Sequence, residues 1–247
     1  MTRRVVVLAD PAAVAAATAD RVVAAARNAI QRRGVFRMAL SGGATPLLAY
    51  PLLVAPPRVD GVDWSRVEFF WGDERPVPPD HPESNFRAAQ AGLLSRLPGV
   101  RPEAIHRMPA ERPDLDAAAR DYQAEMAGAF GDTADEAKVP VLDLVWLGMG
   151  RDGHTASLFP GSAALAERMR WVVGNWAPSP AAWRMTLTYP VLNAAREALF
   201  QVCGPGKDAA FATVRAGSPA SPAAAVRARR TLWIVDLAVA GGAGYTG

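Results

Sequence analysis

Short apolar runs alternate with longer helical patterns along most of this chain, and this alternation limits its possible folds more than any other feature. Strands are predicted at residues 5–9, 35–40, 67–71, 142–147, 185–188, 198–203 and 232–235. Helices are predicted at residues 11–34, 46–54, 84–93, 114–130 and 207–216. Strands joined through helices pair in parallel, and the helices pack on the sheet. We therefore predict an α/β fold, a doubly wound and mostly parallel sheet with helices on both faces.

The composition fits a single α/β domain spanning residues 1–247. Hydrophobic residues make up 50% of the chain and charged residues 21%, which leaves ample material for one core. The Pro/Arg-rich stretch at 97–113 is predicted to be a surface connection and not a domain linker. The net charge of +3 comes from scattered basic residues, which argues against a nucleic-acid partner.

A single cysteine, Cys203, excludes an internal disulfide and fits a reducing cytoplasm, where we expect the protein to work. The apolar stretch near the N-terminus is too short for a signal peptide or a membrane span, so no membrane partner is expected. The sequence is compatible with a monomer or a small homo-oligomer.

The loop that follows the predicted strand at 142–147 has the most informative chemistry. It contains glycines, among them Gly150 and Gly153, that allow sharp turns and a close approach to a ligand. Asp152 and His154 lie in this loop, and histidine can exchange a proton near neutral pH. Ligands of open α/β sheets bind where loops leave the carboxyl ends of the strands. The pattern predicts an active site, although a lone histidine at a strand end can also be structural.

A second loop, Ser41-Gly42-Gly43-Ala44-Thr45-Pro46, lies between a predicted strand and its helix. Its glycines let backbone N–H groups turn inward, its hydroxyl side chains add donors, and its proline suits a first helical turn. The loop matches neither the Walker A pattern nor the dinucleotide-binding pattern G-x-G-x-x-G, so a small phosphate ester is the predicted ligand. The alternative is a tight turn with a capping threonine.

Three adjacent charged residues, Asp73, Glu74 and Arg75, follow the third predicted strand. Charges that lie together at a strand end and are followed by prolines are difficult to explain by solvation alone, and Asp73 and Arg75 are the stronger functional candidates. Farther along, the alternative to a functional role for His81 and Asn85 is turn and capping chemistry, with Ser84 as the N-cap of the next helix.

Only two of the 27 basic residues are lysines, Lys138 and Lys207. Lys138 falls in a predicted solvated connection. Lys207 follows a predicted strand at the start of a helix, where a compact ammonium group can donate to a phosphate. Arg184, at the beginning of another predicted strand, is a second candidate for the same anion; the alternative is an ordinary surface residue.

These motifs, taken in order, resemble those of the 6-phosphogluconolactonases, and the resemblance spans nearly the whole chain. The matching segments are 41–46, 72–75, 81–85, 148–161, 184–186, 206–207 and 233–236. One departure is Ser218-Pro219-Ala220, because the family usually has a leucine before Pro-Ala. We expect this departure to alter packing near the last helix more than it alters the chemistry.

The related glucosamine-6-phosphate isomerases/deaminases share the fold and a similar Asp-Gly-His loop. They carry a glutamate immediately before the proline that follows this loop, where this chain has Phe159. They also tend to have a tyrosine after Asp-Glu, where this chain has Arg75. Both differences favour a lactonase. A phenyl ring can neither give nor take a proton, and Phe159 is expected to shield His154 from bulk water.

The resemblance implies hydrolysis of 6-phospho-D-glucono-1,5-lactone, a small sugar phosphate lactone, in the oxidative pentose phosphate pathway. His154 would be the general base that activates water, and Asp152 would orient the imidazole. Backbone N–H groups of a glycine loop would stabilise the oxyanion. The implied substrate-binding residues are Ser41, Gly42, Gly43, Thr45, Arg184 and Lys207 at the phosphate, Asp73 and Arg75 near the sugar, and Gly150 and Gly153 in the histidine loop.

No cofactor and no metal are expected, because a lactone is already an activated ester and the three histidines and one cysteine are widely separated. Two other functions stay open. An isomerase/deaminase would use the same phosphate grip but needs a proton relay around C1 and C2, which Phe159 opposes. A non-catalytic sugar-phosphate sensor would use the same fold, but it normally needs an output domain, and no basic helix-turn-helix segment is evident.

Overall fold

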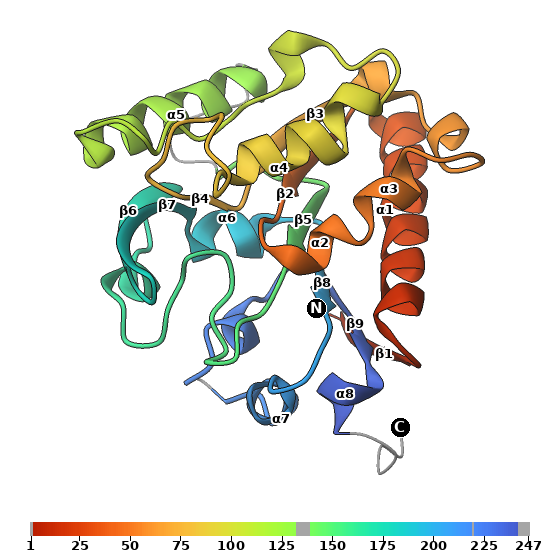
Figure 1. The fold of residues 1–247 in the computed structure, drawn as a ribbon. Helices are drawn as coiled ribbons and strands as arrows, with labels where there is room; N and C mark the ends of the chain where they lie inside the picture. The colour runs from red at the N-terminus through yellow and green to blue at the C-terminus, as the bar shows by residue number, and fades with distance from the viewer. Residues whose placement is uncertain (1, 132–138, 219, 242–247) are drawn as a thin grey trace.

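A six-stranded parallel sheet forms the centre of the computed structural model, which describes residues 2–131, 139–218 and 220–241 (Figure 1). The strands lie in the order β1 (Thr2–Leu8), β9 (Arg230–Asp236), β8 (Glu197–Val202), β5 (Leu144–Leu147), β2 (Phe36–Leu40) and β3 (Val67–Trp71). Every neighbouring pair in this sheet is parallel. The predicted α/β architecture is confirmed. The predictions for Lys138 and for Pro219 lie outside the described residues.

Helix α1 (Pro11–Arg33) illustrates how local sequence sets the elements. Asp10 accepts a hydrogen bond from the N–H of Ala13 at 2.8 Å, and Gly34, with φ of 79°, ends the helix in a left-handed conformation. The buried face of α1 consists of small and β-branched side chains that pack on the sheet. Figure 1 shows α1 on one side of the sheet and α5 (Leu115–Ala129) and α6 (Tyr189–Ala194) on the other.

The prediction of one continuous helix at 46–54 is wrong, because the segment forms two short helices, α2 (Ala44–Leu47) and α3 (Tyr50–Leu53). Pro51 lies in the first turn of α3 and has no N–H to continue a helix from α2. The other predicted helices form within one or two residues of their expected ends, as α4 (Asn85–Gly92), α5 and α7 (Asp208–Arg215).

Several short elements complete the described structure. They are helix α8 (Leu237–Ala240) and the 3₁₀ turns Val59–Gly61, Trp64–Arg66, Leu94–Arg96, Pro102–Ala104, Ala163–Ala166 and Ala223–Ala225. The connection at 97–113 is more than a surface loop, because Ile105 pairs beside Phe69 of β3 and Met108 is buried. No helix in the described ranges is long and apolar enough to span a bilayer.

A second, antiparallel sheet was not predicted. It consists of β4 (Asp73–Glu74), β7 (Ala181–Leu187) and β6 (Val172–Pro178), in that order. The strand predicted at 185–188 is part of β7 and belongs to this sheet. Pairing of Asp73 with Thr186 and of Glu74 with Met185 brings the charged segment after β3 beside Arg184.

The strand order places a crevice between β2 and β5. From β2 the chain proceeds outward to β3, whereas from β5 it proceeds through β8 to β9 in the opposite direction. Loops that leave two neighbouring strands in opposite directions open a ligand site at the carboxyl edge of the sheet. The loops after β3, β2, β5 and β8 therefore end beside one another.

Candidate active site

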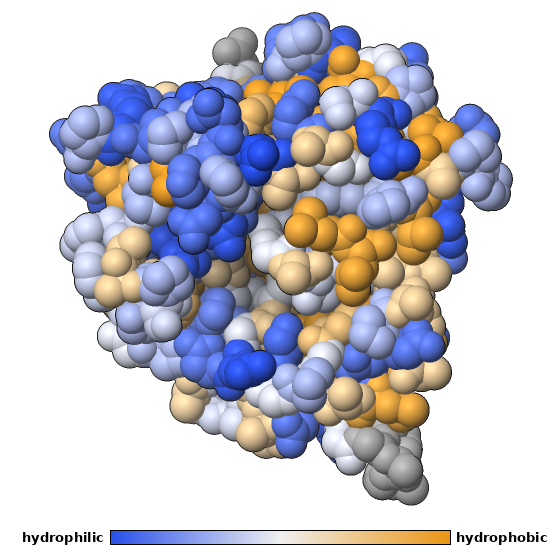
Figure 2. Space-filling model, viewed as in Figure 1, coloured by the Kyte–Doolittle hydropathy of each residue, from blue (hydrophilic) through white to orange (hydrophobic). Residues whose placement is uncertain are grey.

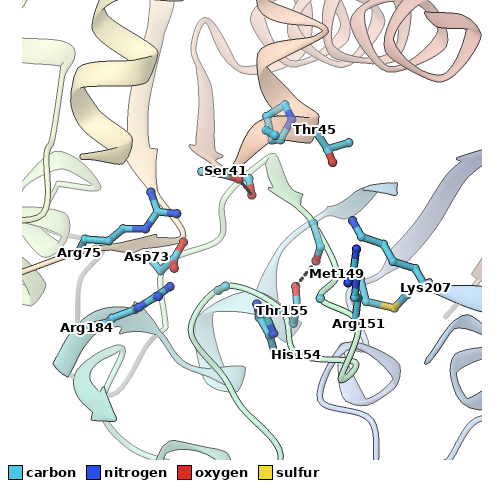
Figure 3. A pocket seen from close by; sticks show the side chains of 17 residues that line it. Ser41, Thr45, Asp73, Arg75, Met149, Arg151, His154, Thr155, Arg184 and Lys207 are labelled. Carbon is cyan, nitrogen blue, oxygen red and sulfur yellow. Dashed lines mark hydrogen bonds between the residues drawn. The ribbon is translucent and has the colours of Figure 1, made fainter. Parts of the chain in front are cut away.

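A cavity of about 350 Å³ lies at this carboxyl edge, a volume in the usual range for small-molecule sites (Figure 3). Figure 2 shows the same face hollowed near its centre, with hydrophilic residues on the left and below and a hydrophobic patch on the right. Ten of the predicted site residues line the cavity: Ser41, Gly42, Gly43, Thr45, Asp73, Arg75, Gly150, His154, Arg184 and Lys207. Residues from the segments that follow β2, β3, β5 and β8, and Arg184 of β7, thus converge on one space.

His154 and Asp152 form the predicted pair. Nδ1 of His154 lies 2.6 Å from Oδ1 of Asp152, and the same oxygen accepts a hydrogen bond from the His154 backbone N–H at 3.1 Å. Asp152 is not among the residues that line the cavity, whereas His154 is. Pairing through Nδ1 leaves Nε2 as the nitrogen that can take a proton from a bound water.

Two glycines shape the loop around this pair. A β-carbon on Gly150 would lie 2.2 Å from ring atoms of His154 and 2.7 Å from Oδ1 of Asp152, so only glycine leaves room for the pair. Gly153 does not line the cavity; it has φ of 79° and donates to the Gly150 carbonyl at 3.1 Å. Gly153 therefore supports the turn, and its predicted contact with substrate stays a prediction.

Phe159 packs against His154, as expected from the sequence. The two ring centroids are 4.5 Å apart with the planes tilted by 39°, and Phe159 is buried. The guanidinium carbon of Arg184 lies 5.7 Å from the Phe159 centroid. Phe159 thus shields one side of the imidazole with a group that cannot transfer protons.

Asp73 and Arg75 are held in place by Asn85 and Ser157. The Ser157 hydroxyl donates to Oδ2 of Asp73 at 2.6 Å, and Nδ2 of Asn85 donates to the Asp73 carbonyl at 2.8 Å. Nη1 of Arg75 donates to Oδ1 of Asn85 and, at 2.9 Å, to the Glu83 carbonyl. Asn85 therefore does more than the alternative of turn and capping chemistry would require, because its side chain connects two cavity residues.

Glu74 ties this segment to the start of α4 through hydrogen bonds. Its carboxylate accepts hydrogen bonds from the backbone N–H groups of Arg75, Asn85 and Phe86, each at 2.8 Å, and from the Ser84 hydroxyl at 3.1 Å. Only 2% of Glu74 is exposed, and burial raises the pKa of its carboxyl group. Ser84 caps α4 as predicted, and His81 accepts a hydrogen bond from the Glu83 N–H in the preceding turn.

Arg184 is 92% buried, so the interpretation of this residue as an ordinary surface arginine is wrong. Burial lowers the pKa of its guanidinium, and its Nε has no hydrogen-bond partner among the described residues. Figure 3 shows Arg184 with Asp73 and Arg75 on one side of the cavity and Lys207 on the opposite side, with His154 between them. We call the first group, Asp73, Arg75 and Arg184, the aspartate side.

The opposite side contains a cation that the sequence analysis did not single out. Arg151 lines the cavity and lies beside Lys207 (Figure 3). The sequence signal that could have identified Arg151 is its position directly before Asp152 in the histidine loop. We call Arg151 and Lys207 the lysine side. Burial lowers the pKa of the Lys207 ammonium, and burial raises the pKa of the nearby Cys203 thiol to about 12, which keeps that thiol protonated.

The loop from Ser41 to Thr45 closes the top of the cavity in Figure 3. The Tyr50 hydroxyl donates to the Ser41 carbonyl at 3.1 Å, and Nε2 of Gln201 donates to the Thr45 carbonyl at 3.0 Å. A β-carbon on Gly42 would lie 1.8 Å from Oδ1 of Asn85, so the loop can approach the aspartate side only with glycine there. Between them, the loop and the two sides offer many donors to an anionic ligand.

Among the residues with described positions, no three His, Cys, Asp or Glu side chains are grouped so that they could hold a metal ion. The acids near the cavity instead pair with serine, asparagine or histidine.

Comparisons with known proteins agree along the length of the chain. The sequence model of the glucosamine-6-phosphate isomerases/6-phosphogluconolactonase family matches residues 9–233. A 6-phosphogluconolactonase from Nostoc sp. is 38% identical over 243 residues, covering 96% of this chain and 97% of that protein. One from Streptomyces coelicolor is 38% identical over 247 residues, covering 97% and 94%. The solved 6-phosphogluconolactonase from Trypanosoma cruzi is similar in fold, with a TM-score of 0.85 at 27% identity and 99% of each chain covered.

Proposed function

The chain belongs to the family of glucosamine-6-phosphate isomerases and 6-phosphogluconolactonases, and on this basis we propose that it hydrolyses 6-phospho-D-glucono-1,5-lactone to 6-phosphogluconate. This reaction belongs to the oxidative pentose phosphate pathway. The observation that supports it best is the His154–Asp152 pair, at 2.6 Å, on the wall of a cavity rich in cations. Relatives named for this reaction match almost the whole chain.

In the proposed mechanism, Nε2 of His154 removes a proton from water as the water oxygen attacks C1 of the lactone. Asp152 stabilises the imidazolium that forms. Backbone N–H groups of the glycine loops stabilise the oxyanion. The bond between C1 and the ring oxygen then breaks, His154 returns its proton to the ring oxygen, and the new carboxylic acid loses its proton to solvent.

We assign the 6-phosphate to the loop from Ser41 to Thr45 together with Lys207. The resemblance places Arg184 at the phosphate as well, but Arg184 lies on the aspartate side, across the cavity from Lys207. We therefore propose that Arg184 and Arg75 contact the ring end of the substrate, and that the buried carboxylate of Asp73 accepts hydrogen bonds from sugar hydroxyls.

The isomerase/deaminase alternative requires an ionisable group near C1, and the ring next to His154 is the phenyl group of Phe159. The sensor alternative does not require the His154–Asp152 pair. We also propose that the chain acts as one domain, as a monomer or small homo-oligomer in the cytoplasm, without a nucleic-acid partner.

The test is a coupled assay with freshly prepared 6-phosphogluconolactone, in which a dehydrogenase specific for 6-phosphogluconate reports the product. The spontaneous rate is subtracted, because the lactone decays unaided. We expect fast hydrolysis by the wild-type protein and no ammonia release from glucosamine 6-phosphate. Ammonia release without lactone hydrolysis would establish the deaminase, and binding of phosphorylated sugars without either reaction would establish the sensor.

A further inference from the structure

Arg151 occupies a position that the family pattern Gly-x-Gly-x-Asp-Gly-His leaves open, so the resemblance assigns it no role. In the structure it lines the same cavity as Lys207. Figure 3 shows the two side chains next to each other, with their nitrogen atoms directed toward Thr45. Arg151 comes from the loop after β5 and Lys207 from the loop after β8, and these strands are neighbours.

The backbone around Gly206 makes this approach possible. A β-carbon on Gly206 would lie 3.3 Å from Nε of Arg151 and 3.7 Å from its Cδ and Cζ atoms. The arginine side chain therefore lies against the loop that carries Lys207. The contact fixes where the guanidinium can reach, namely the part of the cavity beside the ammonium group.

The cations of the lysine side form no ion pair with an acid among the described residues, although the nearby carboxylate of Asp236 opposes the lowering of the Lys207 pKa by burial. Away from the cavity, several half-buried arginines pair with carboxylates, as in Arg21–Glu197, Arg33–Asp143 and Arg37–Glu68. The ion pairs of the described residues include neither Arg151 nor Lys207. Lys207 is half-buried and Arg151 is exposed, so their like charges repel one another with partial screening by solvent. Burial lowers the pKa of Lys207, Cys203 and Asp236 act against this shift, and the positive charge of Arg151 adds to it.

We propose that Arg151 is a second cationic ligand of the substrate phosphate, which it binds together with Lys207 and the loop from Ser41 to Thr45. A phosphate monoester carries close to two negative charges near neutral pH, so it matches two cations better than one. The planar guanidinium can donate to two phosphate oxygens, whereas the ammonium is a point donor. The inference rests on the proposed function in so far as the ligand is a phosphate ester.

The test compares Arg151→Gln, Arg151→Lys and, as a matched control, Arg27→Gln. Arg27 is an exposed arginine on α1, far from the cavity lining. Arg151→Gln is expected to raise KM for the phosphorylated lactone about 10-fold, the effect of losing one charged hydrogen bond, and to change kcat little. Hydrolysis of unphosphorylated gluconolactone should be unchanged, Arg151→Lys should recover most of the loss, and the control should resemble wild type. Equal losses on both lactones would overturn the proposal.

A second measurement separates this inference from the proposed function, because it needs no turnover. Inorganic phosphate should raise the melting temperature of the wild-type protein and of Arg27→Gln, and should raise that of Arg151→Gln much less. Without phosphate, Arg151→Gln should be at least as stable as wild type, since the repulsion with Lys207 is removed. If phosphate stabilises Arg151→Gln as strongly as wild type, the inference is wrong whether or not the protein is a lactonase. If the phosphate effect is lost but wild type hydrolyses no lactone, the proposed function fails and the inference stands.

Discussion

The two sides of the cavity are built on opposite principles. On the aspartate side, Asp73 and Arg75 are fixed by hydrogen bonds to Asn85 and Ser157, and the buried carboxylate of Glu74 holds the backbone beneath them. On the lysine side, Arg151 and Lys207 face each other without a carboxylate partner among the described residues. The fold fixes Asp73 and Arg75 on the aspartate side, although Nε of Arg75 and Nε of Arg184 have no hydrogen-bond partner there among the described residues, whereas the cations of the lysine side form no ion pair at all.

This difference has a consequence for catalysis. Groups held rigidly by the fold can stabilise a transition state without reorganising, so the aspartate side is suited to the reacting end of the substrate. Cations without an ion-pair partner gain most when an anion binds, so the lysine side is suited to the phosphate. His154 lies between the two sides and acts on the bond at the reacting end (Figure 3).

The largest expected effect is on kcat and comes from removing His154, the proposed general base between the two sides. His154→Ala should lower kcat at least ~100-fold, the usual scale for losing a general base. Binding of 6-phosphogluconate, measured by calorimetry, should change much less, because neither side of the cavity is altered. Hydrolysis at the parent rate would remove His154 from the mechanism.

A smaller effect, on stability, should distinguish the rigid side from the uncompensated one. Glu74→Ala leaves three backbone N–H groups and the Ser84 hydroxyl without their acceptor, which should lower the free energy of unfolding by ~2–3 kcal/mol. Denaturant unfolding would measure it. Removing charge on the lysine side, in Arg151→Gln, should cost no stability. The comparison fails if both variants are equally destabilised.

The smallest effect is a pH dependence on the lysine side. Lys207 is charged below its pKa and neutral above it. Burial lowers that pKa and Arg151 lowers it further, against the opposing effects of Cys203 and Asp236. The affinity for 6-phosphogluconate should therefore fall with rising pH earlier than an ordinary lysine would allow. Arg151→Gln should move the fall to higher pH, and Lys207→Arg should remove it. Calorimetry above about pH 7.5, where the phosphate is already doubly ionised, measures this. Identical profiles for wild type and Lys207→Arg would contradict it.

Much of the fold could be predicted because its signals are local. The strand β3 was predicted at its observed bounds, and α1 was bounded correctly by Asp10 and Gly34, whose capping roles depend only on neighbouring residues. The second sheet could not be predicted in this way. β4 is only two charged residues long, and it is a strand because Asp73 and Glu74 pair with residues more than a hundred positions away.

In the candidate site too, contacts between near neighbours in the sequence could be predicted, and contacts that depend on tertiary packing could not. The Asp152–His154 contact spans two residues and could be inferred from the loop motif. The roles of Glu74 and Asn85 depend on the packing of α4 against β4, and the sequence offers only the ordinary signals of a capped helix. The separation of Arg184 from Lys207 depends on the order of strands in two sheets, so the sequence gives both as cations at strand ends without placing them on different sides.

The most direct test of the two-sided account compares Arg184→Ala with Lys207→Ala on phosphorylated and unphosphorylated gluconolactone. Each variant removes one cation from one side. Lys207→Ala should lower kcat/KM for the phosphorylated lactone ~10–100-fold, as expected from the loss of charged hydrogen bonds, and leave the unphosphorylated lactone nearly unaffected. Arg184→Ala should lower kcat/KM for both lactones by similar factors. If both variants lose activity only on the phosphorylated lactone, the two cations share the phosphate and the division of the cavity into two sides is wrong.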